Sequence, residues 1–161
     1  MTEQMTEQMT TRVTEQVGSP SSSQPISAPG KHPICTLAEL PEGSHVVRQI
    51  TERLSVGVYH VDGQLVAFRN HCPHNGAPIC EGTVGSAIVA DDNFQRCLKY
   101  EGRILRCPWH AWEFLLPEGV TLTKPVFRLL RHPVTVEDGQ VFVGASASIS
   151  VAPVTLPKAT A

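Results

Sequence analysis

The chain of 161 residues is long enough for one domain with one hydrophobic core, since 41% of its residues are apolar. Its formal net charge of −2 is too small to indicate a polyanionic partner such as nucleic acid. The sequence has no long uncharged apolar run, no apolar secretory signal and no twin-arginine pair near its start. We therefore expect a soluble, cytoplasmic protein that binds neither nucleic acid nor a membrane.

The two ends of the chain differ in composition from its middle. Residues 1–30 repeat the unit MTEQ and then become rich in Ser and Pro, with few large apolar groups to offset the entropy cost of ordering. We expect this segment to be a disordered tail. Residues 145–161 are small and interrupted by proline, and we expect a second, loose tail there. The single domain is expected over residues 33–144.

Three pairs of an acidic residue and glycine lie between β-prone runs, namely Asp62–Gly63, Glu101–Gly102 and Asp138–Gly139. Asp-Gly flanked by alternating apolar residues is a strong hairpin signal, because both positions of the turn need positive φ. No stretch shows a sustained helical period with caps. The sequence therefore predicts an all-β fold, an antiparallel sandwich or small barrel.

Two short segments each combine one cysteine with one histidine. Cys72 and His74 lie in NHCPHNGAPICEG, and Cys107 and His110 lie in RCPWHAWEF. Each segment contains proline, is predicted to be a loop and follows a predicted strand. In a chain with five cysteines and no secretory signal, such a Cys/His group indicates metal binding or catalysis more than a disulfide.

Three interpretations of these four residues are open from the residues alone. The first is structural zinc, although zinc sites usually keep two cysteines together and two histidines together. The second is a [2Fe–2S] cluster with two Cys on one iron and two His on the other, so that each loop gives one ligand to each iron. The third is a set of buried thiols and hydrogen-bonded histidines without metal, which the presence of two such loops makes the weakest.

The segments CPHNGAP and RCPWHAWEF closely resemble the two ligand boxes of Rieske ferredoxins and of the Rieske domains of aromatic-ring oxygenases. The resemblance extends over ICTLAELPEG, GVYHVDGQLVAFRNHCPH and HPVTVEDGQVFV, and so covers about residues 33–143. It implies a Rieske-like antiparallel β-sandwich or barrel with a small cluster-binding subdomain of two ligand loops. It also implies that Cys72 and Cys107 bind one iron, and that His74 and His110 bind the other with their outer nitrogens towards solvent. No catalytic residue is expected.

The resemblance implies an electron-transfer protein of the ferredoxin type, which passes single electrons between a reductase and an oxygenase or another oxidoreductase. A carrier component is favoured over a stand-alone enzyme, because the sequence has no nucleotide-binding motif and no second iron site of two His and a carboxylate. A redox-sensing or regulatory [2Fe–2S] protein is the alternative, and a structural zinc module is a weaker one.

The stretch between the ligand boxes is longer than in the compact ferredoxins of this family. Thirty-two residues, 75–106, separate His74 from Cys107. We expect the extra residues to form a lengthened hairpin in which 96–100 pairs with 104–107 across Glu101–Gly102, with an acidic tip at Asp91–Asp92.

The residues around the second box lead to three further expectations. Ala111 stands where glycine is commoner, and we expect it to be tolerated if its φ is negative. Three aromatic residues are expected to pack in the core behind the loop, namely Trp109, Trp112 and Phe114. The family resemblance places no disulfide or sulfur-binding hydroxyl beside the cluster, which implies a reduction potential near the low end of the Rieske range, about −150 mV.

Overall fold

The computed structural model describes residues 30–155. The rest of the two expected tails, residues 1–29 and 156–161, lies outside the described residues. Within the described range, no helix is long and apolar enough to cross a membrane.

Strands make up nearly all of the regular structure, with two single-turn 3-10 helices, η1 (Leu37–Glu39) and η2 (Ile79–Glu81). In chain order the strands are β1 (Lys31–Thr36), β2 (His45–Thr51), β3 (Leu54–Val61), β4 (Gln64–Arg69), β5 (Thr83–Ala90), β6 (Arg96–Arg106), β7 (Glu113–Leu115), β8 (Val120–Thr121), β9 (Arg131–His132), β10 (Val134–Glu137), β11 (Gln140–Gly144) and β12 (Val154–Thr155). The expected all-β fold is confirmed.

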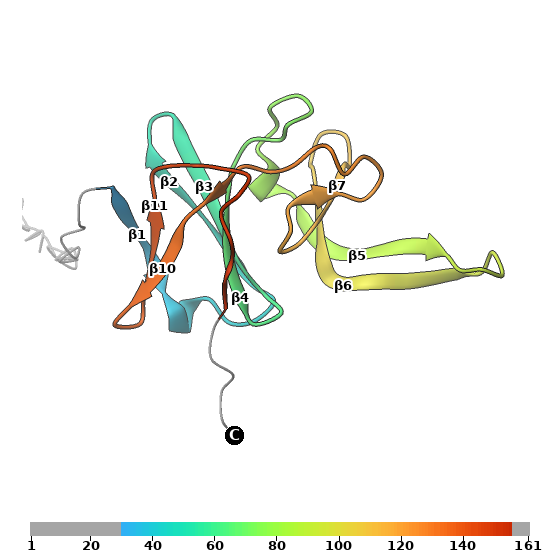
Figure 1. Ribbon diagram of the computed structural model, residues 1–161, viewed down its shortest axis with the longest axis horizontal. Helices are drawn as coiled ribbons and strands as arrows, with labels where there is room; N and C mark the ends of the chain where they lie inside the picture. Colours follow the sequence, from blue (N-terminus) through green and yellow to red (C-terminus); the bar gives the residue numbers. More distant parts are fainter. Residues whose placement is uncertain (1–29, 156–161) are drawn as a thin grey trace, which may run out of the picture.

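Two antiparallel sheets form a sandwich, and a third sheet forms a second lobe beside it (Figure 1). The first sheet has the order β1-β11-β10, and the second has the order β12-β4-β3-β2 with β9 also on β4. Alternating apolar side chains of both sheets meet in one core: Ile34, Val56, Val58, Leu65, Ala67, Val134, Val141 and Val143. The third sheet, β5-β6-β7-β8, carries the segments on either side of the second Cys/His box.

Two of the three expected turns are confirmed. Asp62 and Gly63 join β3 to β4 with φ of 52° and 67°, and Asp138 and Gly139 join β10 to β11 with φ of 49° and 76°. Positive φ at both central residues matches the twist of the strands on either side.

The expected turn at Glu101–Gly102 is wrong, because β6 runs straight through it and pairs with β5. Tyr100 and Gly102 have positive φ but form a bulge, in which β6 places residues 100–103 opposite Ser86 alone. The chain turns at the acidic tip instead, where the Asp91 carboxylate accepts the backbone N–H groups of Asn93 and Gln95. That carboxylate satisfies the turn locally, so the acidic tip was correctly expected and the position of the turn was not.

The described part of the expected C-terminal tail, residues 145–155, is attached to the sandwich. Arg131 and Ser148 exchange backbone hydrogen bonds, and Arg131 Nη1 donates to the Val151 carbonyl oxygen at 2.8 Å. Val154–Thr155 then pairs with β4. Over this stretch the chain extends the second sheet.

Candidate metal centre

The two Cys/His segments form loops with the same backbone hydrogen bonds. In the first loop, Cys72 donates its N–H to the Ala77 carbonyl and accepts at its own carbonyl from Gly76, both at 2.8 Å. The two bonds close the loop into a compact turn directly after β4. They hold the cysteine side chain towards the core and leave the tip of the loop outside.

The second loop repeats this pattern after β6. Cys107 donates its N–H to the Trp112 carbonyl at 2.9 Å, and Ala111 donates to the Cys107 carbonyl at 3.0 Å. The residue four positions after each cysteine, Gly76 or Ala111, has a positive φ. The two segments are therefore one loop conformation built twice.

The two cysteines lie next to each other in the core between the lobes, and both are buried. Burial raises the pKa of the Cys72 thiol, and the neighbouring Cys107 thiol raises it further. The backbone N–H groups of His74 and Asn75 point at the Cys72 sulfur and oppose that rise in pKa, because they stabilise a thiolate. This end of the site is a dry pair of sulfur donors.

The two histidines lie next to each other at the surface. The ring centroids of His74 and His110 are 4.9 Å apart with the planes at 76°, and both side chains are exposed. Trp112 stacks on His74 at 4.3 Å and 9°, and it makes a T-shaped contact with Phe127 at 5.1 Å. The stacking fixes the orientation of His74, and the His110 ring makes a T-shaped contact with Trp109 at 6.4 Å.

All four predicted ligands are thus brought together, but as two pairs. Between residues 30 and 155, no three His, Cys, Asp or Glu side chains converge as the ligands of a single metal ion. A buried sulfur pair and an exposed imidazole pair provide donors for two metal atoms with two protein ligands each. This donor set fits a [2Fe–2S] cluster with two Cys and two His ligands.

The aromatic residues around the second loop differ in burial. Phe114 is in the core as expected, and Trp112 is partly buried and packs against that core. Trp109 does not pack in the core: it is 58% exposed, so that expectation was wrong. Trp109 stands two residues after its cysteine, the place that His74 has in the first loop, and this place is the exposed tip.

Ala111 was expected to be tolerated if its φ is negative, but its φ is +54°. A side chain on this left-handed backbone costs about 1–2 kcal/mol, which explains why glycine suits the position better.

Position 82 requires glycine, because the backbone of Arg106 lies too close to leave room for a side chain. A Cβ there would lie 1.8 Å from the Arg106 carbonyl oxygen, directly before Cys107. The exit of the first loop thus packs on the backbone that enters the second, and this contact sets the distance between the loops.

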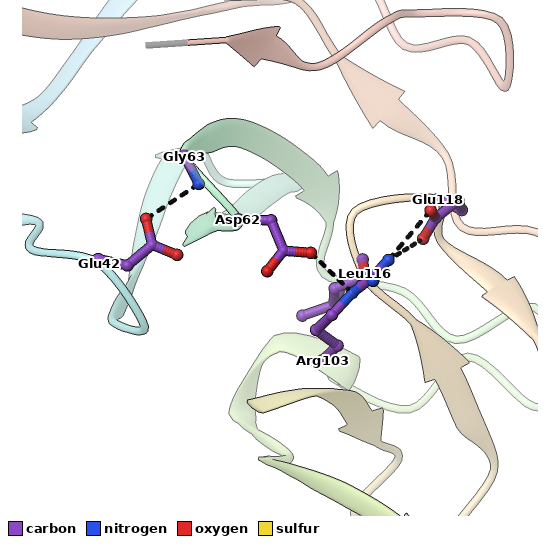
Figure 2. Close-up of polar contacts among 6 residues, drawn as sticks. All are labelled: Glu42, Asp62, Gly63, Arg103, Leu116 and Glu118. Atoms are coloured by element: carbon purple, nitrogen blue, oxygen red, sulfur yellow. Dashed lines mark hydrogen bonds and ion pairs between the residues drawn. The ribbon is translucent and has the colours of Figure 1, made fainter. Parts of the chain in front are cut away.

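Several basic residues of this region are held by structural contacts. Arg103 on β6 pairs with Asp62 at 3.1 Å, donates to the Leu116 carbonyl at 2.7 Å and reaches Glu118 (Figure 2). Arg106 pairs with Glu113 at 2.9 Å. The Arg103–Asp62 pair joins the turn between β3 and β4 to the third sheet, so that sandwich and lobe hold one arrangement, whereas the Arg106–Glu113 pair lies within the third sheet.

The remaining three cysteines are free thiols outside the ligand loops: Cys35, Cys80 and Cys97. Cys80 is fully buried and donates to the Phe68 carbonyl at 3.7 Å, and burial raises its pKa to about 12. A thiol that stays protonated is unreactive, so the surroundings of Cys80 suit a packing role.

The chain matches the model of the Rieske [2Fe-2S] domain over residues 30–132. It is 30% identical over 114 residues to the 3-phenylpropionate/cinnamic acid dioxygenase ferredoxin subunit of Photorhabdus laumondii, covering 70% of this chain and 92% of that protein. Among solved structures, the Sphingomonas yanoikuyae B1 ferredoxin has a TM-score of 0.52 at 26% identity, covering 72% of this chain and 99% of its own. A chain in the complex of reduced oxygenase and oxidized ferredoxin of carbazole 1,9a-dioxygenase shares the fold with a TM-score of 0.57 at 22% identity, covering 74% of this chain and 96% of its own. The family match spans more than half of the sequence and includes both loops, so the chain belongs to the Rieske [2Fe-2S] domain family.

Proposed function

We propose that Cys72 and Cys107 bind one iron of the [2Fe–2S] cluster and that His74 and His110 bind the other. The protein is a Rieske-type electron-transfer protein, and the cluster is its cofactor. The support for this ligand assignment is that the same two loops bring together two buried thiols and two exposed imidazoles. Ferredoxin subunits among the relatives favour the carrier function over the regulatory alternative and the zinc module.

The cysteine side of the site is buried, and the histidine side is exposed. When bound, the cluster accepts and releases one electron at a time. Buried Cys72 and Cys107 keep water away from the sulfur side, while His74 and His110 extend to the surface. Two neutral imidazoles in place of two thiolates leave the site with less negative charge, which raises its potential relative to an all-cysteine site. The histidine end is therefore the place where an electron enters or leaves.

The surface around the histidines has an aromatic centre and basic residues near it. Trp109 lies beside His110, with ring centroids 6.4 Å apart, and is exposed. Lys124 and Arg128 are exposed on the segment that carries Phe127, the residue in contact with Trp112. An exposed tryptophan with nearby positive charge suits a redox protein with an acidic docking surface. We propose a reductase and an oxygenase, or another oxidoreductase, as the partners.

Two further assignments belong to the same proposal. We assign the domain to residues 33–144, with an N-terminal tail at 1–30; residues 145–155, which were expected in a C-terminal tail at 145–161, join the domain because β12 pairs with β4. The site of action is placed in the cytoplasm, where reductant is available and free thiols such as Cys80 stay reduced.

The ligand assignment is tested by metal analysis and electron paramagnetic resonance of the dithionite-reduced protein. We expect two iron and two sulfide per chain and a paramagnetic spectrum of the mixed Cys/His type. His110→Cys should lower the potential or abolish the cluster. The control, His71→Cys, changes an exposed histidine in the same loop region and should leave the spectrum intact. An unaltered spectrum in His110→Cys would show that the ligands are misassigned.

The carrier function is tested by stopped-flow mixing of reduced protein with purified oxygenases and oxidised protein with reductases. Rapid change of the visible bands with one partner of each kind is the expected result. Absence of transfer to every oxygenase and oxidoreductase tried, with an intact cluster, would contradict it.

A further inference from the structure

β5 and β6 continue beyond the second lobe as a two-stranded arm, which we define as residues 87–99. The inner end of β6, Ile104–Arg106, pairs with both β5 and β7, whereas its outer part pairs with β5 alone. Figure 1 shows the arm extending away from both lobes. An isolated pair of strands is only marginally stable in water, so we expect an arm of this length to be stabilised by contact with a partner.

The arm exposes apolar side chains on one face. Ile88 and Leu98 lie directly opposite each other across the two strands and are 67% and 61% exposed. Phe94 at the tip is 90% exposed. Val84 lies further back on the same face of β5, and there it packs against the core. The arm thus continues the buried face of the sheet into solvent.

The outer edge of β5 has none of the usual protection against pairing. β5 is the terminal strand of its sheet, and its sequence TVGSAIVA contains no charged residue and no proline. Exposed edge strands are normally protected by charges, proline or bulges. The one bulge in this pair is on β6, so it leaves the free edge of β5 regular. The Ser86 carbonyl of β5 already accepts from Arg106 Nη2, and beyond it the edge at residues 87–90 is open to another strand.

We propose that β5 is a self-association edge, along which a second copy of this chain pairs in antiparallel orientation. The two arms then form one continuous sheet in the order β6-β5-β5-β6. Such a contact is isologous, since the same surface serves both copies, and it closes as a dimer instead of growing into a fibre.

The charges of the arm favour this occupant and this orientation. The uncharged β5 brings no like charges together when it pairs with itself. The other charges of the arm lie at its tip and on β6, where Asp91 and Asp92 are offset by Arg96 and Lys99, so that residues 87–99 carry no net charge. Parallel pairing would set the two acidic tips together, whereas antiparallel pairing keeps them at opposite ends of the contact. A strongly charged redox partner is disfavoured here, because the arm has no net charge and the free edge of β5 has no charged residue.

The test is sedimentation equilibrium of the full-length, cluster-loaded protein over a wide concentration range. We expect a monomer–dimer equilibrium, with a species of twice the 17.5 kDa mass of the chain. Ile88→Lys places a charge in the edge strand and should weaken the dimer about tenfold or more. The matched control is Ile149→Lys, which adds the same charge at another exposed isoleucine (56%) outside the arm and should leave the dimer unchanged. The visible spectrum of the cluster confirms that each variant is folded.

A second measurement locates the contact. Amide hydrogen exchange of the β5 segment should slow as protein concentration rises, and this change should be absent in Ile88→Lys. A wild-type protein that stays monomeric at every concentration would overturn the proposal, as would a dimer that survives Ile88→Lys. A monomeric wild type in which Ile88→Lys slows transfer to a redox partner would overturn it as well, and would assign the arm to that partner. None of these outcomes depends on which residues hold the cluster.

Discussion

Gly76 and Ala111 occupy the same place in the two ligand loops. Each stands four residues after a buried cysteine and donates its backbone N–H to the carbonyl of that cysteine, at 2.8 Å and 3.0 Å. Each has a left-handed backbone, with φ of 76° and 54°. Glycine adopts this conformation without steric cost, and alanine does not. The second loop therefore carries strain that the first does not.

Ala111→Gly should relieve that strain and raise the free energy of unfolding by about 1 kcal/mol. The reciprocal control, Gly76→Ala, should lower stability by a similar amount or more, because its new Cβ also lies 3.1 Å from the His71 ring. The measurement is the midpoint of cluster bleaching on heating. A lower midpoint for Ala111→Gly would mean that the alanine is not strained.

Trp112→Leu should raise the reduction potential. The indole stacks on His74 and screens that side of the site from water. Water admitted by the smaller side chain stabilises the reduced state, which carries more negative charge than the oxidised one. We expect a shift below the 59 mV that corresponds to about tenfold in a one-electron equilibrium. Redox titration is the measurement, and Trp109→Leu is the control: its exposed side chain should affect partner transfer more than potential. A drop in potential in Trp112→Leu would contradict this reasoning.

The reduction potential of the wild-type protein should lie in the low part of the Rieske range, at about −150 mV and not at about +300 mV. The two residues whose carbonyls close the loops, Ala77 and Trp112, carry no hydroxyl that could donate to sulfur. Without such donors the reduced cluster gains less stabilisation. A clearly positive midpoint in a spectroelectrochemical titration would refute this prediction.

Arg103→Ala should destabilise the protein by about 2 kcal/mol, because it removes a charged donor from one carbonyl and two carboxylates at once. Its contacts join Asp62 in the sandwich to Leu116 and Glu118 in the second lobe (Figure 2). Asp62→Asn is the matched variant, since asparagine tolerates the positive φ at this turn and removes only the exposed ion pair. It should cost less than about 1 kcal/mol. The measurement is chemical denaturation, and an equal loss of unfolding free energy in the two variants would show that the contact with the Leu116 carbonyl contributes nothing.

His132 should make stability depend on pH. Its Nδ1 donates to the Gly144 carbonyl at 2.9 Å, its Nε2 is buried without a partner in the described chain, and burial lowers its pKa. The folded protein therefore binds this proton less readily than the unfolded chain, whose histidines titrate near about pH 6.5. The contribution to stability is complete above that pH and declines as the pH falls through it towards the lower folded pKa.

His132→Asn keeps a donor for Gly144 and removes the titration. The loss of unfolding free energy between about pH 7.5 and pH 5.5 should therefore be smaller in the variant than in the wild type. The same loss in both proteins would mean that His132 is not the group responsible.

The sequence alone determined the features that depend on local chemistry. The turns at Asp62–Gly63 and Asp138–Gly139 follow from residues that accept positive φ, and the two Cys/His boxes carry their own loop residues. These signals lie within a few residues of each other, so no partner strand is needed to recognise them. They were enough for the all-β fold, the family and the candidate ligands.

Only the tertiary structure decided what depends on contacts between distant segments. Glu101–Gly102 has the form of a turn, yet it lies in a bulge because buried Ile104 and Leu105 pair with β7 and hold β6 in the sheet. Trp109 is as apolar as Phe114, but it stands at a loop tip and faces solvent. The pairing of Cys72 with Cys107 depends on Gly82 resting against the backbone of Arg106. Strand register and side-chain direction are set by the partner that a strand finds, and a single segment of sequence does not contain that partner.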